Sequence, residues 1–154
     1  MKIIDNITVY DEITLIGISN TSADIEHIAR VFNMFAEADI NVDMISQLPP
    51  GGANSGFSFT VGDSDFVKVL AICAELRKLN SEIKISVSSG NTKISVSGEA
   101  MRDLSGVAAK IFTAAAKANA DVRMITTSET DVSLLVVSTD SESVVKSIEN
   151  AFSE

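Results

Sequence analysis

Few side chains in this 154-residue chain could carry out catalysis. His27 is the only histidine and Cys73 is the only cysteine. Both fall within segments of helical pattern, where a packed or solvated imidazole and a buried, inert thiol are the expected roles. No group of His and Cys residues has the spacing of a zinc site. We therefore expect no catalytic base, no nucleophile and no bound metal from these residue types.

A glycine-rich loop and two acidic pairs are the other candidates for chemistry. The sequence PPGGANSG at residues 49–56 lacks the lysine and the spacing of a GxxxxGK[ST] phosphate-binding motif, so we interpret it as an ordinary loop. The pairs Asp11–Glu12 and Asp140–Glu142 lie at the ends of expected elements, where caps and turns account for acidic residues. The sequence thus predicts a chain with no active site and no cofactor.

Composition excludes several partners. The formal net charge is −9, which argues against nucleic acid or an anionic membrane, because Lys and Arg drive phosphate binding. No apolar run approaches the roughly 20 residues that span a bilayer, and the N-terminal sequence MKIIDNITVYDE does not have the pattern of a signal peptide. Together with the single cysteine, which cannot form an intramolecular disulfide, these features predict a cytoplasmic location.

Hydrophobic periodicity divides the chain into strands and helices. Strands are expected at residues 7–10, 13–18, 42–48, 56–61, 83–87, 93–98, 122–127 and 131–138. Helices are expected at about 24–38, after a cap at Asp63–Ser64, after Gly106, and over the apolar residues between 144 and 152. Ile25, Leu70 and Phe112 are among the residues predicted to face a core.

The same succession of helix, turn and strand residues occurs twice, about eighty residues apart. Phe32 corresponds to Phe112, Ala36 to Ala116, and Met44–Ile45 to Met124–Ile125. This period is too long for a solenoid repeat, so we interpret it as two copies of one small domain.

Each copy has the order βαββα, and the first copy adds a final strand at 83–87. The second copy ends without its last strand, whereas the strand at 7–10 has no place in the first copy. Because an unfinished sheet leaves backbone groups unpaired, we expect the N-terminal strand to complete the second sheet. The predicted fold is α+β, with two ferredoxin-like βαββαβ domains that each have a four-stranded antiparallel sheet and helices on one face. The first predicted domain is 12–90, and the second combines 91–154 with 5–11, so that the N-terminal strand interlocks the two domains. The uncovered sheet faces and edges of these domains predict a homodimer.

The two halves of the chain resemble the tandem ACT domains in the regulatory half of aspartate kinases. Ala100–Met101–Arg102, Ser105–Gly106–Val107 and the sequence ITTSE at 125–129 are similar to motifs of the second ACT domain. ITLIGI (13–18), INVDMISQ (40–47) and GFSFTV (56–61) look like the first ACT domain. The resemblance covers essentially the whole chain, including ITVYDE at its start, but no kinase domain accompanies it. Some members of the family make the ACT pair as a separate subunit, and a chain beginning at Met1 is similar to that form.

The resemblance implies a regulatory protein that binds an end-product amino acid, of the lysine or threonine type, at an interface between ACT domains, and that controls a kinase allosterically. Backbone N–H groups and a helix N-terminus would hold the ligand carboxylate, while acidic and amide side chains would hold its ammonium group. The positions that match the family's ligand-binding residues are Asn41, Val42, Gln47, Asp121, Val122, Ser128 and Glu129. Gln47 is expected to contact the effector, and for Ser128 a ligand contact and a solvent-facing strand hydroxyl remain alternatives.

The chain departs from the family in its first loop. The family's Asp-Lys-Pro-Gly is replaced by residues 19–26, which are longer and contain neither Pro nor Gly. The family's His-Pro-Gly is replaced by Leu104–Ser105–Gly106, and its Thr-Thr-Asp by Asn54–Ser55–Gly56. A site formed here would depend on Asn20, Ser22 and Asp24. Three hypotheses follow: a regulatory amino-acid-binding module with a kinase partner, a ligand-independent dimerisation scaffold that retains the fold, and the regulatory fragment of a full aspartate kinase.

Overall fold

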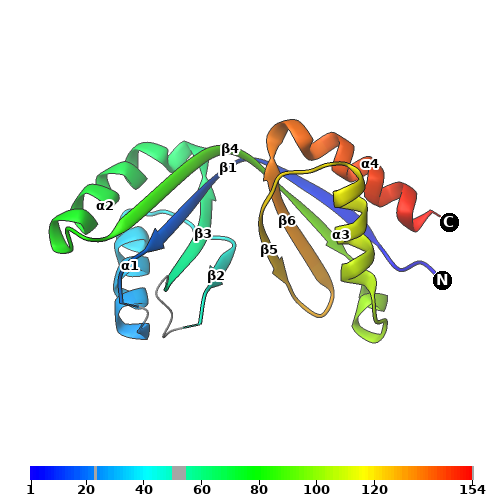
Figure 1. Ribbon diagram of the computed structural model, residues 1–154, viewed down its shortest axis with the longest axis horizontal. Coiled ribbons are helices and arrows are strands. Elements are labelled where there is room, and N and C mark those ends of the chain that lie inside the picture. Colours follow the sequence, from blue (N-terminus) through cyan, green and yellow to red (C-terminus); the bar gives the residue numbers. More distant parts are fainter. Residues whose placement is uncertain (23, 50–54, 154) are drawn as a thin grey trace. The chain divides into compact units, whose positions relative to one another are not determined.

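The computed structural model describes residues 1–22, 24–49 and 55–153, so most of the predicted loop, residues 50–54, lies outside the described residues. The chain forms two compact units. The first unit is Glu12–Ser89, and the second unit combines Met1–Asp11 with Gly90–Glu154 (Figure 1).

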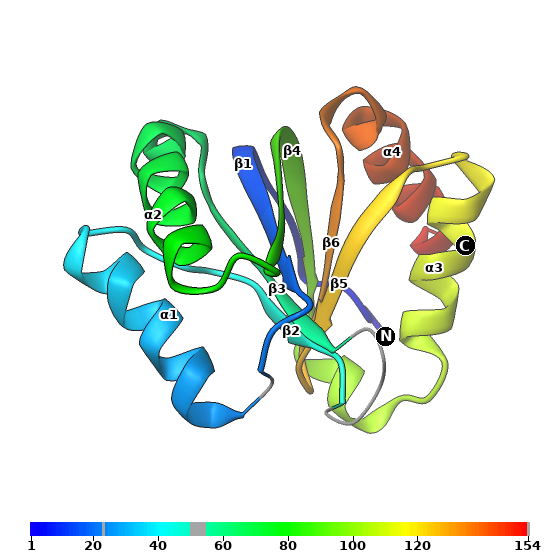
Figure 2. The ribbon, with the colours of Figure 1, turned by 60° about the vertical axis from the view of Figure 1, so that its left-hand side comes forward.

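The first unit is an antiparallel sheet with two helices on one face. Its elements are the C-terminal part of β1 (Asn6–Ser19), α1 (Ile25–Glu37), β2 (Ile45–Gln47), β3 (Gly56–Gly62), α2 (Phe66–Leu79) and the N-terminal part of β4 (Lys84–Ser97). The strand order is β2-β3-β1-β4, and a short 3₁₀ turn, Asp63–Asp65, leads into α2. Figure 2 shows α1 and α2 on the same side of these strands.

The second unit repeats this plan. It contains the N-terminal part of β1, the C-terminal part of β4, α3 (Val107–Lys117), β5 (Val122–Thr127), β6 (Asp131–Val137) and α4 (Ser141–Phe152). The 3₁₀ turns Glu99–Asp103 and Ser138–Asp140 precede the two helices. The strand order is β1-β4-β6-β5, and α3 and α4 lie on one face of the sheet (Figure 2). The predicted α+β class with ferredoxin-like, antiparallel sheets is confirmed.

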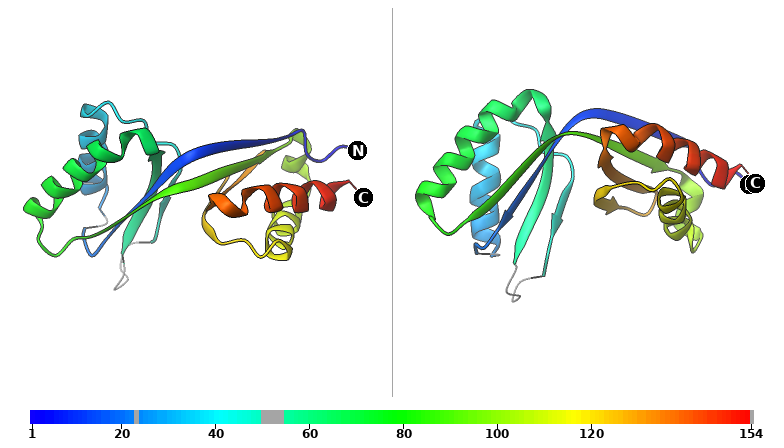
Figure 3. Two further views of the ribbon diagram at one scale, coloured as in Figure 1. Left: turned by 90° about the horizontal axis from the view of Figure 1, so that it is seen from above. Right: turned by 45° about the horizontal axis from the view of Figure 1, so that its top comes forward.

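Two strands are longer than predicted. The expected strands at 7–10 and 13–18 form the single strand β1, and those at 83–87 and 93–98 form β4. β1 and β4 run beside each other (Figure 3). The predicted breaks coincide with left-handed backbone at Glu12 (φ 58°) and Gly90 (φ 72°). One left-handed residue can bend a strand without ending its hydrogen bonding. This explains why the sequence predicts two short strands at each of these places and the structure has one long strand.

β2 is shorter than the predicted strand at 42–48. The backbone N–H of Asp43 donates to the carbonyl of Thr60, but the N–H of Met44 donates to the Thr60 side-chain Oγ1, both at 3.0 Å. The Thr60 hydroxyl thus takes the place of a ladder acceptor, and regular pairing begins only at Ile45.

Each unit has its own hydrophobic core between sheet and helices. In the first unit Phe59 is fully buried, and its ring lies 4.9 Å from the rings of both Phe32 and Phe35. In the second unit the core is aliphatic, with Ile94, Ile111, Leu134 and Ile148 fully buried.

Three of the large residues predicted to face a core are exposed instead. Ile25 is 76% exposed, Leu70 is 46% exposed and Phe112 is 37% exposed. The helical period places these residues near the apolar face, but they lie outside the buried residues of their helices, which in α1 are Val31 and Phe35.

The duplication is visible in the ends of α1 and α3. Asp39 and Asn119 both have left-handed backbone, and the residues that follow them, Ile40 and Ala120, donate N–H groups to the carbonyls of Phe35 and Ala115. Both helices therefore end in the same Schellman-type cap.

The N-terminal segment is fixed to the end of β4. The N–H of Asp5 donates to the carbonyl of Ser97 at 2.8 Å, and the Asp5 carboxylate accepts from the N–H of Glu99 at 3.1 Å. Ile3 passes so close to Gly98 that a Cβ there would lie 2.2 Å from the Ile3 carbonyl oxygen. Only glycine permits this approach of two backbones. No helix in the described part of the chain is long and apolar enough to cross a membrane.

Gly98→Ala tests whether the N-terminal segment is an integral part of the second unit. The added methyl group meets backbone, which cannot rotate away, so we expect the free energy of unfolding in urea to fall by about 1–3 kcal/mol. Gly62→Ala is the matched control, because its Cβ would meet only the Ser64 hydroxyl at 3.6 Å. Equal stability of the two variants would contradict this role of the N-terminal segment.

Candidate functional site

Three of the predicted ligand residues form the loop between β1 and α1. The side-chain amide of Asn20 donates to the carbonyl of Glu82 at 2.8 Å. The Ser22 hydroxyl donates to Asp24 Oδ2 at 2.6 Å, and Asp24 Oδ1 accepts from the N–H of His27 at 2.8 Å. Asp24 is thus the N-cap of α1. The structure brings Asn20, Ser22 and Asp24 into one loop, where each already has a partner within the chain.

The Asp24 carboxyl is electrostatically favoured in its ionised form. Its pKa lies below the ordinary value of 3.8, first because the Ser22 hydroxyl donates to it and second because the His27 N–H does. The carboxylate also lies at the positive end of the helix dipole.

A cavity of about 210 Å³ lies beside this loop, between α1 and α2. Its polar side includes Thr21, Ser22 and Arg30, and its apolar side includes Val31 and Leu76. This cavity adjoins the predicted loop site and has room for part of a ligand.

Gln47 lies at the same end of the first sheet, on the edge strand β2. It is exposed and pairs with Phe57, which faces the helices, so strand alternation places the Gln47 side chain on the helix side. Its neighbours Ser46 and Leu48 point to the opposite face. Gln47 pairs with Phe57, which in turn pairs with Ile18, two residues before Asn20, so Gln47 lies at the same end of the sheet as the loop before α1.

Asn41 and Val42 lie at the other end of the unit. They follow α1, whose 13 residues separate them from the Asp24 loop by on the order of 20 Å. Asn41 is exposed, and Val42 packs against the first core. A single copy of the first unit therefore does not bring Asn41 and Val42 to Asn20, Ser22 and Asp24.

The corresponding turn of the second unit is closed by side chains. The N–H of Asp121 donates to Asp140 Oδ2 at 2.9 Å, and the Asp121 carboxylate pairs with Arg123 at 2.9 Å. Val122 begins β5 and lines a small apolar cleft with Phe112. In the first unit no hydrogen bond from the Asn41 N–H occurs among the described residues. The first unit thus leaves open a backbone donor that the second unit uses internally.

Ser128 and Glu129 lie in the turn between β5 and β6, directly after the predicted strand at 122–127, which the structure reproduces as β5. β5 ends at Thr127, and the Ser128 Oγ accepts from the N–H of Thr130 at 3.4 Å. Glu129 Oε2 pairs with Arg102 Nε at 3.2 Å. Both residues are exposed, so the Ser128 hydroxyl faces solvent from a turn and not from a strand, and contact of Ser128 with a ligand stays a prediction.

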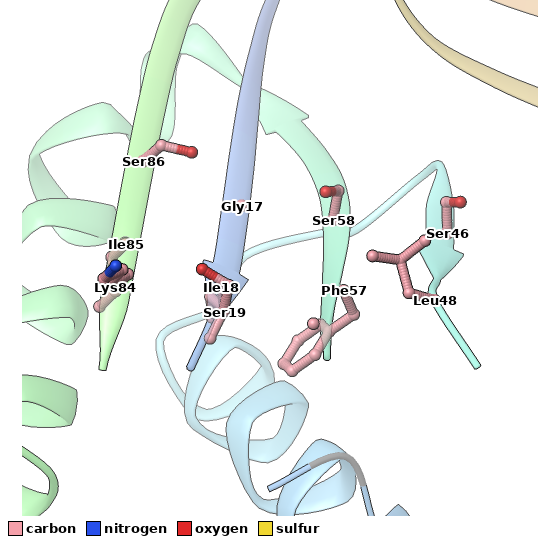
Figure 4. A pocket seen from close by; sticks show the side chains of 11 residues that line it. Gly17, Ile18, Ser19, Ser46, Leu48, Phe57, Ser58, Lys84, Ile85 and Ser86 are labelled. Atoms are coloured by element: carbon pink, nitrogen blue, oxygen red, sulfur yellow. The ribbon is translucent and has the colours of Figure 1, made fainter. Parts of the chain in front are cut away.

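A groove of about 480 Å³ crosses the first sheet on its helix-free face, the face opposite α1 and α2. Ser46 lies opposite Ser58, and Ser58 lies opposite Gly17. Ser86 of β4 completes this row, and Lys84 stands two residues away on the same face of β4 (Figure 4). Ser19 of β1 also lines the groove, which therefore combines four hydroxyl groups, one ammonium group and two glycines that leave space above the sheet.

Sequence reasoning missed this groove. Its residues lie on different strands and are ordinary outward-facing serines when each strand is considered alone. The available signal was the alternation of small polar residues with apolar ones, as in GFSFTV at 56–61, but only the strand register shows that they meet.

His27 and Cys73, the two potentially reactive side chains of the sequence, are both held in contacts within the fold. His27 Nε2 lies 2.9 Å from the Thr21 hydroxyl. Cys73 is a buried free thiol, and burial raises its pKa, which lowers its reactivity. No cluster of His, Cys, Asp or Glu that could hold a metal ion occurs among the described residues.

Comparison with known proteins identifies relatives over almost the whole chain. An ACT domain family model matches residues 94–152. Aspartokinase 2 of Bacillus subtilis is 31% identical over 150 residues, which are 97% of this chain and 36% of that protein. The chain thus spans about a third of the length of the curated relatives that it matches.

Two solved chains match this chain end to end. The regulatory subunit of aspartate kinase from Thermus thermophilus, in its ligand-free form, has a TM-score of 0.85 and 27% identity, covering 98% of this chain and 99% of that one. A chain of the aspartokinase alpha and beta subunits has a TM-score of 0.86 and 30% identity, with coverages of 98% and 99%.

Asp24→Asn tests the charge at the α1 cap. Because the folded-state pKa is lowered, the ionised carboxylate stabilises the folded chain above about pH 4, and this contribution is lost as the pH falls through the folded-state pKa. We expect wild type to melt at a higher temperature than Asp24→Asn at neutral pH, and the difference to shrink as the pH falls below the ordinary value of 3.8 and through the lower folded-state pKa. Thermal unfolding followed by circular dichroism measures it. Adding Ser22→Ala to both proteins should reduce the difference, and a difference independent of pH would contradict the assignment.

Proposed function

The chain belongs to the ACT-domain regulatory family of aspartate kinases, and on this premise we propose that it binds a free amino acid and transmits that binding to a kinase catalytic chain. Its similarity covers only the regulatory part of the curated aspartokinases, so the proposed role is regulatory and not catalytic. The observation that carries the proposal is the end-to-end match with separate regulatory subunits.

The first unit offers the better amino-acid site. Its turn at Asn41 has an open backbone donor for a carboxylate, whereas the equivalent donor in the second unit is already bonded to Asp140. Gln47 and the loop of Asn20, Ser22 and Asp24 supply amide, hydroxyl and carboxylate oxygens for an ammonium group. We propose lysine or threonine as the effector type, as the resemblance implies.

These groups lie at opposite ends of the first unit, which supports a site completed by a second copy of the chain. A ligand that touches groups of two chains favours the assembled state over the separate chains, and this difference in affinity is what allosteric coupling requires. We therefore propose a homodimer through the ACT domains.

A panel of the twenty amino acids in a thermal-shift assay tests the proposed function. A ligand at one hundred times its dissociation constant stabilises the folded state by about 2.7 kcal/mol, so lysine or threonine at millimolar concentration should raise the melting temperature by a few degrees. No shift with any amino acid would instead support a ligand-independent dimerisation scaffold, the alternative favoured by the altered loop at residues 19–26.

Gln47→Ala tests the residue expected to contact the effector. Loss of a hydrogen bond to a charged group should weaken affinity about tenfold or more, measured by isothermal titration calorimetry. Thr127→Ala is the matched control, because Thr127 holds the equivalent place on the edge strand β5 of the second unit. Unchanged affinity in Gln47→Ala would show that the effector binds elsewhere.

The proposed dimer is tested at the edge strands. Ile45 of β2 is 52% exposed and Ile125 of β5 is 42% exposed, so each sheet edge carries an apolar side chain in the same relative position. We expect Ile125→Asp or Ile45→Asp to shift the molar mass towards that of a monomer in analytical ultracentrifugation, because a partner edge would bury an unpaired charge. Val67→Asp, at a 78% exposed position on α2, should leave the mass unchanged. A dimer that persists in both edge variants would exclude these edges as the interface.

A further inference from the structure

The two units allow the groove on the helix-free face to be compared with an internal counterpart. Gly17 pairs with Ser58 between β1 and β3, and Ser95 pairs with Ser133 between β4 and β6. Ser95 therefore holds the place of Gly17, and Ser133 holds the place of Ser58. The comparison depends on strand register alone.

In the second unit a carboxylate joins these two positions. The Ser133 hydroxyl donates to Asp131 Oδ1 at 2.7 Å, and the Ser95 hydroxyl donates to Asp131 Oδ2. Two hydroxyls of neighbouring strands thus share one carboxylate, a charge-assisted arrangement stronger than bonds between neutral groups.

The first unit has no side chain in that place. The register puts Gly56 where the second unit has Asp131. A Cβ on Gly56 would lie 2.5 Å from the carbonyl oxygen of Ile18, so position 56 cannot carry a carboxylate without moving the backbone. The space remains as the groove.

The groove nevertheless keeps the donors. Ser58 is the counterpart of Ser133, and the Ser86 Oγ lies 2.7 Å from where a Cβ on Gly17 would be, so Ser86 supplies a hydroxyl where Ser95 supplies one in the second unit. Within the described residues, the hydroxyls of Ser46, Ser58 and Ser86 make no hydrogen bond, and Lys84 makes no ion pair.

We propose that this groove binds a small organic carboxylate from solution, with the carboxylate in the place that Asp131 occupies in the second unit. The hydroxyls of Ser58 and Ser86 donate to its oxygens, and the Lys84 ammonium neutralises its charge. The rest of the ligand lies towards Leu48 and Ser46, which line the other end of the groove. This site differs from the loop and turn site of the proposed function, and neither depends on the other.

An NMR titration of the full chain with sodium acetate tests the proposal. Acetamide is the neutral control of the same shape, and glycine distinguishes an amino acid from a simple acid, all at constant ionic strength and pH. We expect saturable shifts of the backbone amides of Gly17, Ser58 and Ser86 with acetate, with a millimolar dissociation constant, and none with acetamide. Tighter binding of glycine than of acetate would identify an amino-acid ligand within the same class.

Two variants address the groove directly. Gly17→Ser introduces the serine that the second unit has at this position and places its side chain in the groove. Lys84→Met keeps the aliphatic part of the side chain but removes its charge. Each should weaken acetate binding about tenfold or more. Ser133→Ala alters the counterpart in the second unit and should leave binding in the groove unchanged. Amide resonances of the second unit report whether each variant is folded.

Three results would overturn the proposal. The first is the absence of saturable shifts at the three groove amides with acetate and with glycine. The second is equal affinity in wild type, Gly17→Ser and Lys84→Met. The third is shifts of these amides that follow protein concentration and not acetate, which would mean that a second copy of the chain covers this face. A negative amino-acid panel in the thermal-shift assay would leave the acetate titration unaffected.

Discussion

Backbone hydrogen bonding along β1 and β4 is the constraint on which the rest of the structure depends. Each of these two strands has one part in the first unit and the other part in the second unit. Both units therefore take two of their strands from β1 and β4. In the second unit the N-terminal part of β1 lies beside β4 and supplies the fourth strand of the sheet. The close approach of Ile3 to Gly98 shows how tightly that segment is held. An unpaired sheet edge would cost several backbone hydrogen bonds, which makes this arrangement preferable to two self-contained domains.

The two units share a fold but have diverged in chemistry. Their helices α1 and α3 end in the same cap, and their strands pair in the same register, because both features depend on backbone geometry. Side chains at equivalent places differ in whether they are satisfied within the chain. Asp131 bridges Ser95 and Ser133, whereas Gly56 leaves Ser58 without a partner among the described residues. Unsatisfied donors cost little while water reaches them, and they remain available to a ligand.

This division explains why the first unit is the better candidate for recognition. Its groove and its open turn at Asn41 present polar groups to solvent, while the second unit has closed the equivalent positions. Recognition of a small charged molecule needs only oriented donors and acceptors on a rigid support. The aromatic core around Phe59 supplies that support beneath the first sheet.

The sequence by itself determined the order of helices and strands, the duplication and the need for the N-terminal strand, because hydrophobic period and backbone pairing are local or countable properties. Only the tertiary structure decided that β1 and β4 are continuous through Glu12 and Gly90, since one left-handed residue looks like a turn in the sequence. The exposure of Ile25 and Phe112 depended on which residues of α1 and α3 the fold buries. The groove depended on register, which alone brings serines of four strands to one place.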